Sequence, residues 1–237
     1  MTTAILSALP EEQAGLAALL LNKETIQHAG REFTRGTMHQ KPVVLALSGI
    51  GKVAAATTAT VLIERFAVKR IVFTGVAGGL GDGVQVGDIV LGTRYVQHDM
   101  DASPIFPRFV IPSLGKALLD ADAELIATLL VAACAVSISV NGQKQPQIHQ
   151  GLIASGDRFV SSAAEAQALR AALPDALCVE MEGAAVAQVC HDYGLPFAAV
   201  RTISDRADDT AHLDFSSFVK EVAGPVAVVL ISAFLSN

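Results

Sequence analysis

Continuous apolar runs alternate with helix-forming stretches along the 237-residue chain, and this alternation constrains the fold more than any other feature. Ala4–Leu9, Arg70–Val76 and Phe197–Ile203 are runs of strand length in which polar side chains are few. Strands without apolar–polar alternation are buried on both faces, which is typical of a mainly parallel sheet covered by helices on each side. The sequence therefore predicts an α/β fold, with one domain over residues 1–237 because no linker or internal repeat divides it.

Turn residues and helix signals divide the chain into expected elements. Pro10 suits the first position of a helix, and Pro225 is expected to kink the last one. We expect strands at Ala4–Leu9, Phe33–His39, Pro42–Ser48, Arg70–Val76, Asp88–Val96, Gly151–Ser155, Leu177–Met181 and Phe197–Ile203. We expect helices at Pro10–Leu21, Val53–Phe66, 115–136, Ala163–Ala172, Glu182–Tyr193 and Phe215–Phe234. The glycines from Gly75 to Gly83 are expected to form a turn, and the proline-rich segment Asp99–Leu114 an irregular loop.

Charge and composition argue against several classes of partner. The net charge of −6 and the pI near 5.5 disfavour binding to nucleic acid. Leu125–Val140, the longest apolar run, is short for a membrane span, so we expect a buried helix there and no membrane partner. The N-terminus lacks the basic segment of a signal peptide. Cys134, Cys178 and Cys190 form no CxxC pair and are expected to be buried free thiols of a cytoplasmic protein.

Two glycine-containing segments follow expected strands, but neither matches a known nucleotide-binding loop. Ser48–Lys52 lacks the first glycine and the hydroxyl residue of a phosphate-binding loop, and Thr74–Leu80 does not match the dinucleotide pattern of Gly-x-Gly-x-x-Gly. One interpretation is that these glycines only make tight turns. The other is that they let the backbone approach a ligand at the carboxyl ends of the strands, where open α/β sheets bind ligands.

Acidic residues stand where several of the expected strands end. Glu12, Glu180, Glu182 and Asp205 each follow an apolar run, and any one of them alone fits helix capping or first-turn charge. Acids that converge from three strand ends fit a hydrolysis in which one carboxyl group protonates a leaving group and another handles water. The chain has no Gly-x-Ser-x-Gly motif, and its histidines have no metal-ligand spacing, so neither a metal nor an organic cofactor is expected.

Six motifs in order carry a family resemblance. They are SGIGKVAAA (48–56), TGVAGGL (74–80), VGDIVL (86–91), ASGDRFV (154–160), VEMEGAAVA (179–187) and RTISD (201–205). On these motifs the chain resembles the nucleoside phosphorylase/hydrolase family and, within it, the bacterial 5′-methylthioadenosine/S-adenosylhomocysteine nucleosidases. The resemblance implies a three-layer αβα fold with a central twisted mixed sheet, a homodimer, and hydrolysis of an N-glycosidic bond that releases adenine and a 5-thio-substituted ribose.

The resemblance also implies roles for particular residues. Asp205 protonates N7 of adenine, Glu12 positions or activates the attacking water, and Glu182 holds ribose hydroxyls. Phe159 stacks on adenine, Ile50 and Phe106 line the pocket for the 5′ group, and Phe215 comes from the partner subunit. The implied substrate-binding set is Met181, Phe159, Val160, Ile50, Arg201, Ser204, Val76, Ala77, Phe106 and Phe215. We further expect Glu180 to be a partner of Arg201, which orders the acids and the water.

Two departures from the family pattern leave the exact substrate open. Val76 stands where these nucleosidases have a serine beside the water site, and Arg108 has no counterpart, so it either meets an acidic 5′ substituent or is a surface charge. A purine nucleoside phosphorylase is disfavoured because the expected turns supply only Lys52 for a phosphate, and Glu12 would repel it. A futalosine-type nucleoside hydrolase and a non-catalytic purine nucleoside binding protein remain as alternatives.

Overall fold

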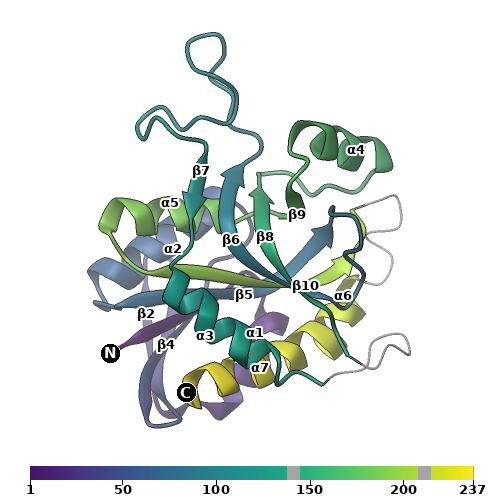
Figure 1. Cartoon of the computed structure of the whole chain (residues 1–237). Coiled ribbons are helices and arrows are strands. Elements are labelled where there is room, and N and C mark those ends of the chain that lie inside the picture. The colour runs from purple at the N-terminus through teal and green to yellow at the C-terminus, as the bar shows by residue number, and fades with distance from the viewer. Residues whose placement is uncertain (138–144, 208–214, 237) are drawn as a thin grey trace.

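Among the described residues, 1–137, 145–207 and 215–236, ten strands pair into one twisted sheet at the centre of the computed structural model (Figure 1). The strands are β1 Thr3–Ser7, β2 Leu21–His28, β3 Arg31–Met38, β4 Lys41–Leu47, β5 Arg70–Gly79, β6 Ile89–Gln97, β7 Leu118–Asp120, β8 Ile148–Ser155, β9 Ala176–Glu180 and β10 Phe197–Asp205. The helices are α1 Pro10–Leu19, α2 Lys52–Glu64, α3 Ala123–Ala133, α4 Ala163–Ala172, α5 Gly183–Tyr193, α6 Phe215–Phe218, the π-helical turn η1 Val219–Ala223 and α7 Gly224–Ser236.

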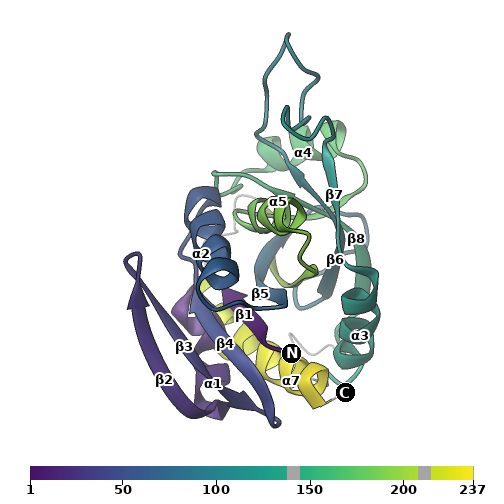
Figure 2. The ribbon, with the colours of Figure 1, turned by 90° about the vertical axis from the view of Figure 1, so that its left-hand side faces the viewer.

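The pairing of the strands is mixed, and part of the sheet closes on itself. The order is β10-β6-β8-β9-β5-β1-β4-β3-β2, and β10 also pairs with β5. The strands β5, β9, β8, β6 and β10 therefore form a ring, while β2, β3 and β4 form an antiparallel ribbon that extends from the other side of β1 (Figure 2). Because β1, β5 and β10 run parallel to one another, their carboxyl ends lie at one edge.

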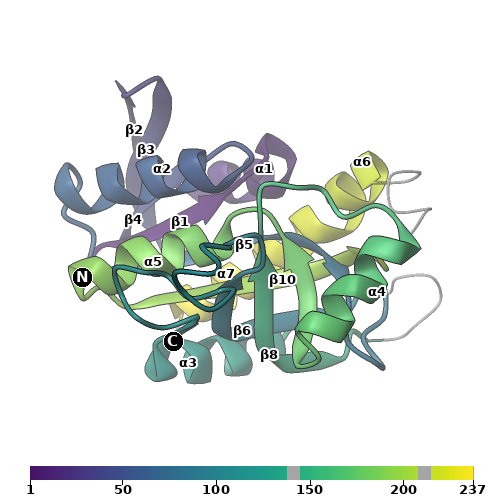
Figure 3. The ribbon, with the colours of Figure 1, turned by 90° about the horizontal axis from the view of Figure 1, so that it is seen from above.

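Helices cover both faces of the sheet, as the apolar runs predict. One core cluster packs α2 and α5 against the sheet, and these two helices lie side by side (Figure 3). A second cluster packs α1, α3 and α7 against the opposite face. The predicted α/β architecture, with helices on both faces of a central mixed sheet, is confirmed.

The predicted glycine turn after β5 is wrong in its position. Gly75, Gly78 and Gly79 belong to the strand itself, which continues to Gly79 in register with β10 and β9. A Cβ on Gly75 would lie 2.9 Å from Oε1 of Glu12, and a Cβ on Gly78 would lie 2.9 Å from Oδ1 of Asp205. Glycine in a strand interior often marks such a close approach, and these two glycines make room for the acids.

Two further predictions of secondary structure need correction. The helix expected over 115–136 begins only at Ala123, because the carboxylate of Asp122 accepts the N–H of Leu125 at 2.8 Å and caps it there. The residues before it form β7, which pairs with β6. The strand β2 was not expected, because its exposed sequence LNKETIQH contains no apolar run.

The C-terminal helix is irregular near Pro225, as predicted. The amide of Gly224 bonds to the carbonyl oxygen of Val219, five residues back, in the π-helical turn that precedes Pro225. Among the described residues, Val219–Ser236 is the segment long and apolar enough to cross a membrane, but half of it is buried inside the protein. It packs on α1 and α3 as a core helix does.

The cysteines are free thiols, as expected, but they are not all buried. Cys178 and Cys190 are buried, whereas Cys134 is exposed because it follows the last residue of α3.

The hydroxyl of Tyr95 provides a test of the closed part of the sheet. It donates to the carbonyl of Gly92 and accepts the N–H of Ala199, both at 2.7 Å, and Tyr95 is fully buried. In Tyr95→Phe the carbonyl of Gly92 and the amide of Ala199 lose this partner, so we expect the free energy of unfolding to fall by about 1–3 kcal/mol. In thermal unfolding this lowers the Tm by roughly 2–4 °C per kcal/mol.

Tyr193→Phe is the matched control, because Tyr193 is 45% exposed. We expect its stability to stay within about 0.5 kcal/mol of the parent. Equal effects of the two substitutions would contradict the assigned role of Tyr95.

Candidate active site

A cavity of about 310 Å³ lies at the carboxyl ends of the strands, where a ligand is expected. Its walls come from the segments that follow β1, β4 and β8, from the ends of β9 and β10, and from the glycine-containing end of β5. The lining residues are Ala8, Leu9, Glu12, Ile50, Val76, Ala77, Gly78, Arg158, Phe159, Val160, Val179, Glu180, Met181, Glu182, Ser204 and Asp205. All three acids to which the resemblance assigns catalytic roles, Glu12, Glu182 and Asp205, are therefore in one cavity.

Most of the other predicted site residues line the same cavity, and three do not. Met181, Phe159, Val160, Ile50, Ser204, Val76 and Ala77 are on its wall. Arg201 lies beneath the wall and is 1% exposed. Phe106 is on the segment between β6 and β7, which projects from the body of the molecule (Figures 1 and 2), and is 37% exposed. The side chain of Phe215 lies outside the described part of the chain.

Sequence reasoning missed several lining residues, chiefly Ala8, Leu9, Val179 and Arg158. Arg158 and Val179 lie within two of the six motifs, and Ala8 and Leu9 end the first apolar run. Apolar residues carry no chemical signal of their own, and Arg158 has no assigned role in the resemblance.

Glu12 is a buried carboxylate held by backbone amides. Pro10 opens α1, and the side chain of Glu12 turns back so that Oε2 accepts the amides of Ala8 at 2.9 Å and Leu9 at 2.8 Å. Its Oε1 accepts the amide of Val76 at 3.1 Å. Burial raises the pKa of Glu12 above its usual value, and the amides offset only part of that rise.

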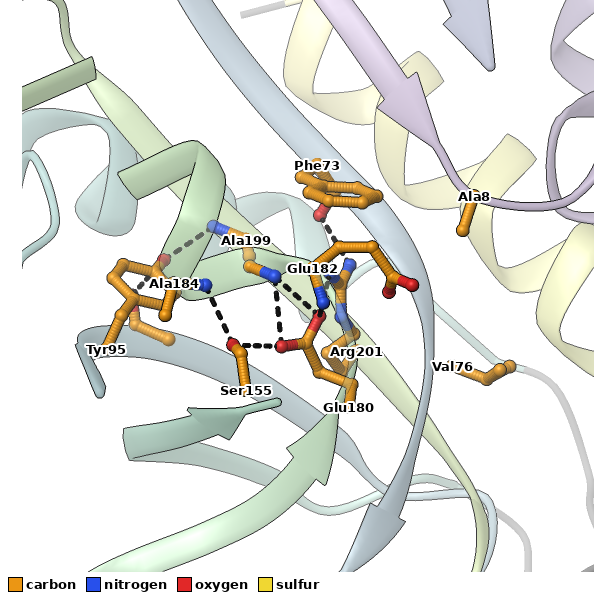
Figure 4. A network of polar contacts seen from close by, with 12 residues as sticks. Ala8, Phe73, Val76, Tyr95, Ser155, Glu180, Glu182, Ala184, Ala199 and Arg201 are labelled. Atoms are coloured by element: carbon orange, nitrogen blue, oxygen red, sulfur yellow. Dashed lines mark hydrogen bonds and ion pairs between the residues drawn. The ribbon is translucent and has the colours of Figure 1, made fainter. Parts of the chain in front are cut away.

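Arg201 and Glu180 form an ion pair under the floor of the cavity. Nη2 of Arg201 lies 2.6 Å from Oε2 of Glu180, and the guanidinium carbon lies 4.1 Å from the centre of the Phe73 ring. Glu180 also accepts the amide of Gly183 at 2.8 Å and the hydroxyl of Ser155 (Figure 4). The predicted pairing of Glu180 with Arg201 is confirmed.

Glu182 points the other way from Glu180. It occupies the N-cap position of α5 without a side-chain capping bond, and its carboxylate is directed toward the space between Ala8 and Val76 (Figure 4). Oε1 accepts the amide of Gly51 at 2.9 Å. Burial, together with the charge of Glu180, raises the pKa of Glu182 to about 8. Glu180 and Glu182 both line the cavity but have different environments, because Glu180 is paired with Arg201 whereas Glu182 accepts a backbone amide.

Asp205 ends β10 at the opposite wall of the cavity. The hydroxyl of Ser204 donates to Oδ2 at 2.7 Å, and the amide of Ala207 donates to Oδ1 at 2.7 Å. The carboxyl group packs on the Cα of Gly78 and is therefore held close to the strand β5.

Cations are few around the cavity and are already paired with acids. Of the lining residues, only Arg158 is cationic, and it is 73% exposed and paired with Glu165 of α4. Nζ of Lys52 lies 2.6 Å from Oδ1 of Asp99. Arg108 is exposed, stacks on Phe109 and does not line the cavity, which fits its interpretation as a surface charge. Across the described ranges, no cluster of three or more His, Cys, Asp or Glu could hold a metal ion.

The cavity combines an apolar slot with an acidic end. Ile50, Phe159, Val160 and Met181 offer apolar surface for a flat or thioalkyl group, and the acids line the same cavity. A wall of this kind can bind a neutral, largely apolar ligand, and carboxyl groups of different environment can supply a proton at one atom and an acceptor at another.

Comparisons with known proteins agree on one family. Residues 2–236 match the model of the phosphorylase superfamily. The chain is 36% identical over 237 residues to the 5′-methylthioadenosine/S-adenosylhomocysteine nucleosidase of Shewanella denitrificans, with 100% of both chains covered. The nucleosidase of this name from Neisseria meningitidis, solved with methylthio-immucillin-A, aligns with a TM-score of 0.91 at 35% identity, covering 99% of this chain and 98% of that one. The structure of futalosine hydrolase of Helicobacter pylori aligns with a TM-score of 0.88 at 34% sequence identity, covering 98% of this chain and 97% of that one.

The raised pKa of Glu182 predicts a pH-dependent effect of Glu182→Gln on stability. A carboxyl group whose pKa is raised by folding stabilises the native state fully at a pH below its pKa in the unfolded chain, 4.5. This contribution is lost as the pH rises through the pKa in the folded protein, about 8. The glutamine keeps an acceptor for the amide of Gly51 but carries no buried charge. We therefore expect similar Tm values at pH 5 and a variant more stable by at least about 2 °C at pH 9.

Glu221→Gln is a control, because Glu221 is an exposed acid on η1 that does not line the cavity. A Tm difference for Glu182→Gln that is the same at pH 5 and pH 9 would show that burial does not raise the pKa of Glu182.

Proposed function

The chain belongs to the phosphorylase superfamily and, within it, to the 5′-methylthioadenosine/S-adenosylhomocysteine nucleosidases, and we propose that its cavity hydrolyses the N-glycosidic bond of these nucleosides. The products are adenine and a 5-thio-substituted ribose. The observation that carries the proposal is the convergence of Glu12, Glu182 and Asp205 on one cavity that also contains Phe159. A protein that only bound nucleosides would have no need to bury several acids together, because burial of carboxylates is costly.

We assign the leaving-group proton to Asp205. Adenine leaves readily only when its negative charge is neutralised, and a proton on N7 makes it a neutral base. Asp205 is at the cavity wall and is held by the hydroxyl of Ser204 and the amide of Ala207, so its orientation is set before the substrate binds. Phe159 stacks on the base, and the backbone of Val160 binds its edge, since both line the same wall.

We assign the water to Glu12 and the ribose to Glu182. The lone pairs of Glu12 that are not used by the amides of Ala8, Leu9 and Val76 are available to accept a proton from water. The side chain of Val76 is apolar and offers this water no hydrogen bond, so Glu12 is the principal polar group for it on this wall. Glu182, with Met181 beside it, binds the ribose hydroxyls, and its ionised form, which becomes the major form above a pKa of about 8, favours positive charge on the ribosyl ring.

Hydrolysis is favoured over phosphorolysis by the charges at the cavity. A phosphate dianion requires several cations, but Arg158 is exposed and paired, Lys52 is paired with Asp99, and Arg201 is buried with Glu180. The acids at the cavity would repel the dianion. Water as the nucleophile meets neither difficulty.

The homodimer, with Phe215 reaching the neighbouring site, remains part of the proposal. Its support is the apolar surface beside the cavity: Ile50 is 59% exposed, Val53 is 78% exposed, and Ile105 on the projecting segment is 82% exposed. Phe106, on that segment, completes the pocket for the 5′ group only if a second subunit brings it there. We also propose one domain over residues 1–237 and a cytoplasmic location, supported by the family match to residues 2–236 and by the free thiols.

Asp205→Asn tests the assigned reaction. The variant keeps an acceptor for the amide of Ala207, but asparagine cannot donate the proton, so we expect kcat for adenine release from methylthioadenosine to fall by about 10²–10⁴-fold. Asp175→Asn, an exposed aspartate outside the cavity, should match the parent. Turnover by the parent should not depend on added phosphate. A phosphate requirement, with ribose 1-phosphate as product, would contradict hydrolysis.

A substrate panel separates the proposed activity from that of a futalosine-type hydrolase. We expect adenine release from methylthioadenosine and adenosylhomocysteine to be faster than from aminodeoxyfutalosine, because Ile50 and Met181 present apolar surface to a thioalkyl group. Adenine release can be followed by its ultraviolet absorbance. Cleavage of aminodeoxyfutalosine alone would assign the chain to the other activity.

A further inference from the structure

Polar contacts join three segments, two of which contribute residues to the wall of the cavity. They are the segment Ile50–Lys52 before and at the start of α2, the residues Gln97–Asp99 at the end of β6, and the segment 156–160 after β8 that contains Phe159. None of these contacts has a part in the reaction as proposed above. They lie between the base side of the cavity and the ribose side.

Asp157 is the centre of the contacts. Its Oδ1 accepts the amide of Lys52 at 2.7 Å, and its own amide donates to Oδ2 of Asp99 at 2.9 Å. Nζ of Lys52 closes the circuit by donating to Oδ1 of Asp99 at 2.6 Å and to Oε1 of Gln97 at 3.1 Å. Both carboxylates thus bind Lys52: Asp157 accepts its backbone amide, and Asp99 accepts its ammonium group.

The same set of hydrogen bonds extends to Glu182, the carboxylate assigned to ribose, through the residue next to Lys52. Gly51, which precedes Lys52, donates its amide to Oε1 of Glu182 at 2.9 Å. Consecutive amides of residues 51 and 52 therefore bind Glu182 on the ribose side and Asp157 on the base side. Gly51 has φ +99° and a Cβ there would lie 3.1 Å from Oδ1 of Asp157, so glycine is required for the two amides to diverge in this way.

We propose that Lys52, Asp99 and Asp157 are positioning residues that set the distance between the adenine-stacking segment and the ribose carboxylate. The proposal rests on the function proposed above, which places adenine on Phe159 and ribose at Glu182. Phe159 is 45% exposed and Asp157 is exposed, so the core packs only part of this segment. The hydrogen bonds of Asp157 connect it to both neighbouring segments.

The location of the ion pair favours positioning over a general contribution to stability. The side chains of Lys52 and Asp99 are 17% and 32% exposed, and a partly exposed pair contributes little to folding. Charge-assisted hydrogen bonds of defined geometry nevertheless fix the register of the loops that they join. Two of the three N–H donors of the Lys52 ammonium group are used by Gln97 and Asp99, and the carboxylate of Asp99 balances its charge.

Asp157→Ala and Asp157→Asn test the proposal as a pair. Alanine removes the acceptor of the Lys52 amide, whereas asparagine keeps an oxygen at that position. We expect Asp157→Ala to raise KM for methylthioadenosine and the Kd of adenine by about tenfold, because a hydrogen bond to a charged group is lost. Its kcat should stay within about threefold of the parent, and Asp157→Asn should restore most of the binding.

The control is Glu24→Gln, which removes the ion pair between Glu24 and Arg35 on strands β2 and β3. This pair has the same length, 2.6 Å, as the pair between Lys52 and Asp99. Glu24→Gln should leave KM and Kd unchanged. Adenine affinity measured by calorimetry separates the two proposals. If the parent binds adenine without turnover, the proposed function fails while the binding series still tests the positioning role. Three results would overturn the positioning role. They are parent-like binding of adenine by Asp157→Ala, binding by Asp157→Asn that is as weak as that of Asp157→Ala, and the absence of adenine binding in the parent and all variants.

Discussion

The ion pair between Arg201 and Glu180 is the interaction on which the site depends. Arg201 is 1% exposed and is the largest fully buried side chain among the described residues. Burial alone would lower its pKa, but the charge and hydrogen bond of Glu180, together with the nearby Glu182 and Glu12, outweigh this and hold the pKa above its usual value. Removal of two charges from water costs several kcal/mol per ion, so such a pair persists only when other hydrogen bonds complete it. Here Ser155, Gly183 and Phe73 provide such bonds, while Nε of Arg201 is buried without a hydrogen-bond partner among the described residues.

The acids of the cavity are arranged around this pair. Arg201 offsets part of the rise in pKa that burial causes at Glu12 and at Glu182. Gly75 pairs with Arg201 in the sheet, and a Cβ there would lie 2.9 Å from Oε1 of Glu12 and 3.3 Å from Nη1 of Arg201. A single buried cation therefore allows several carboxyl groups to lie close together. Glu180 pairs with that cation, whereas Glu12, Glu182 and Asp205 are the acids assigned to the substrate.

The sequence predicts the positions of the acids better than it predicts the backbone that carries them. Glu12, Glu182 and Asp205 follow apolar runs, so their positions at strand ends are predictable. The three strands, β1, β9 and β10, all pair with β5, but β9 does so in antiparallel orientation, which the apolar runs do not predict. The glycines of β5 do not form the expected turn, because strand pairing with β10 outweighs the low strand propensity of glycine. The strand β2 has no apolar signal. The hydrogen bonds among Lys52, Asp99 and Asp157 are not predictable from the sequence. They join Asp99 to residues 47 and 58 positions away, which lie outside the regular strands.

A double-mutant cycle on the buried pair tests this account most directly. It compares Arg201→Met, Glu180→Gln and the double variant by denaturant unfolding, with adenine release measured in parallel. Arg201→Met leaves a buried carboxylate unpaired, so we expect a loss of about 3–5 kcal/mol, and we expect the double variant to be more stable than the sum of the single effects by about 1–3 kcal/mol. Turnover should be low in Arg201→Met and in the double variant, because in both of them the acids lose their common cation. Additive effects on stability, or normal turnover in Arg201→Met, would contradict the central place of the pair.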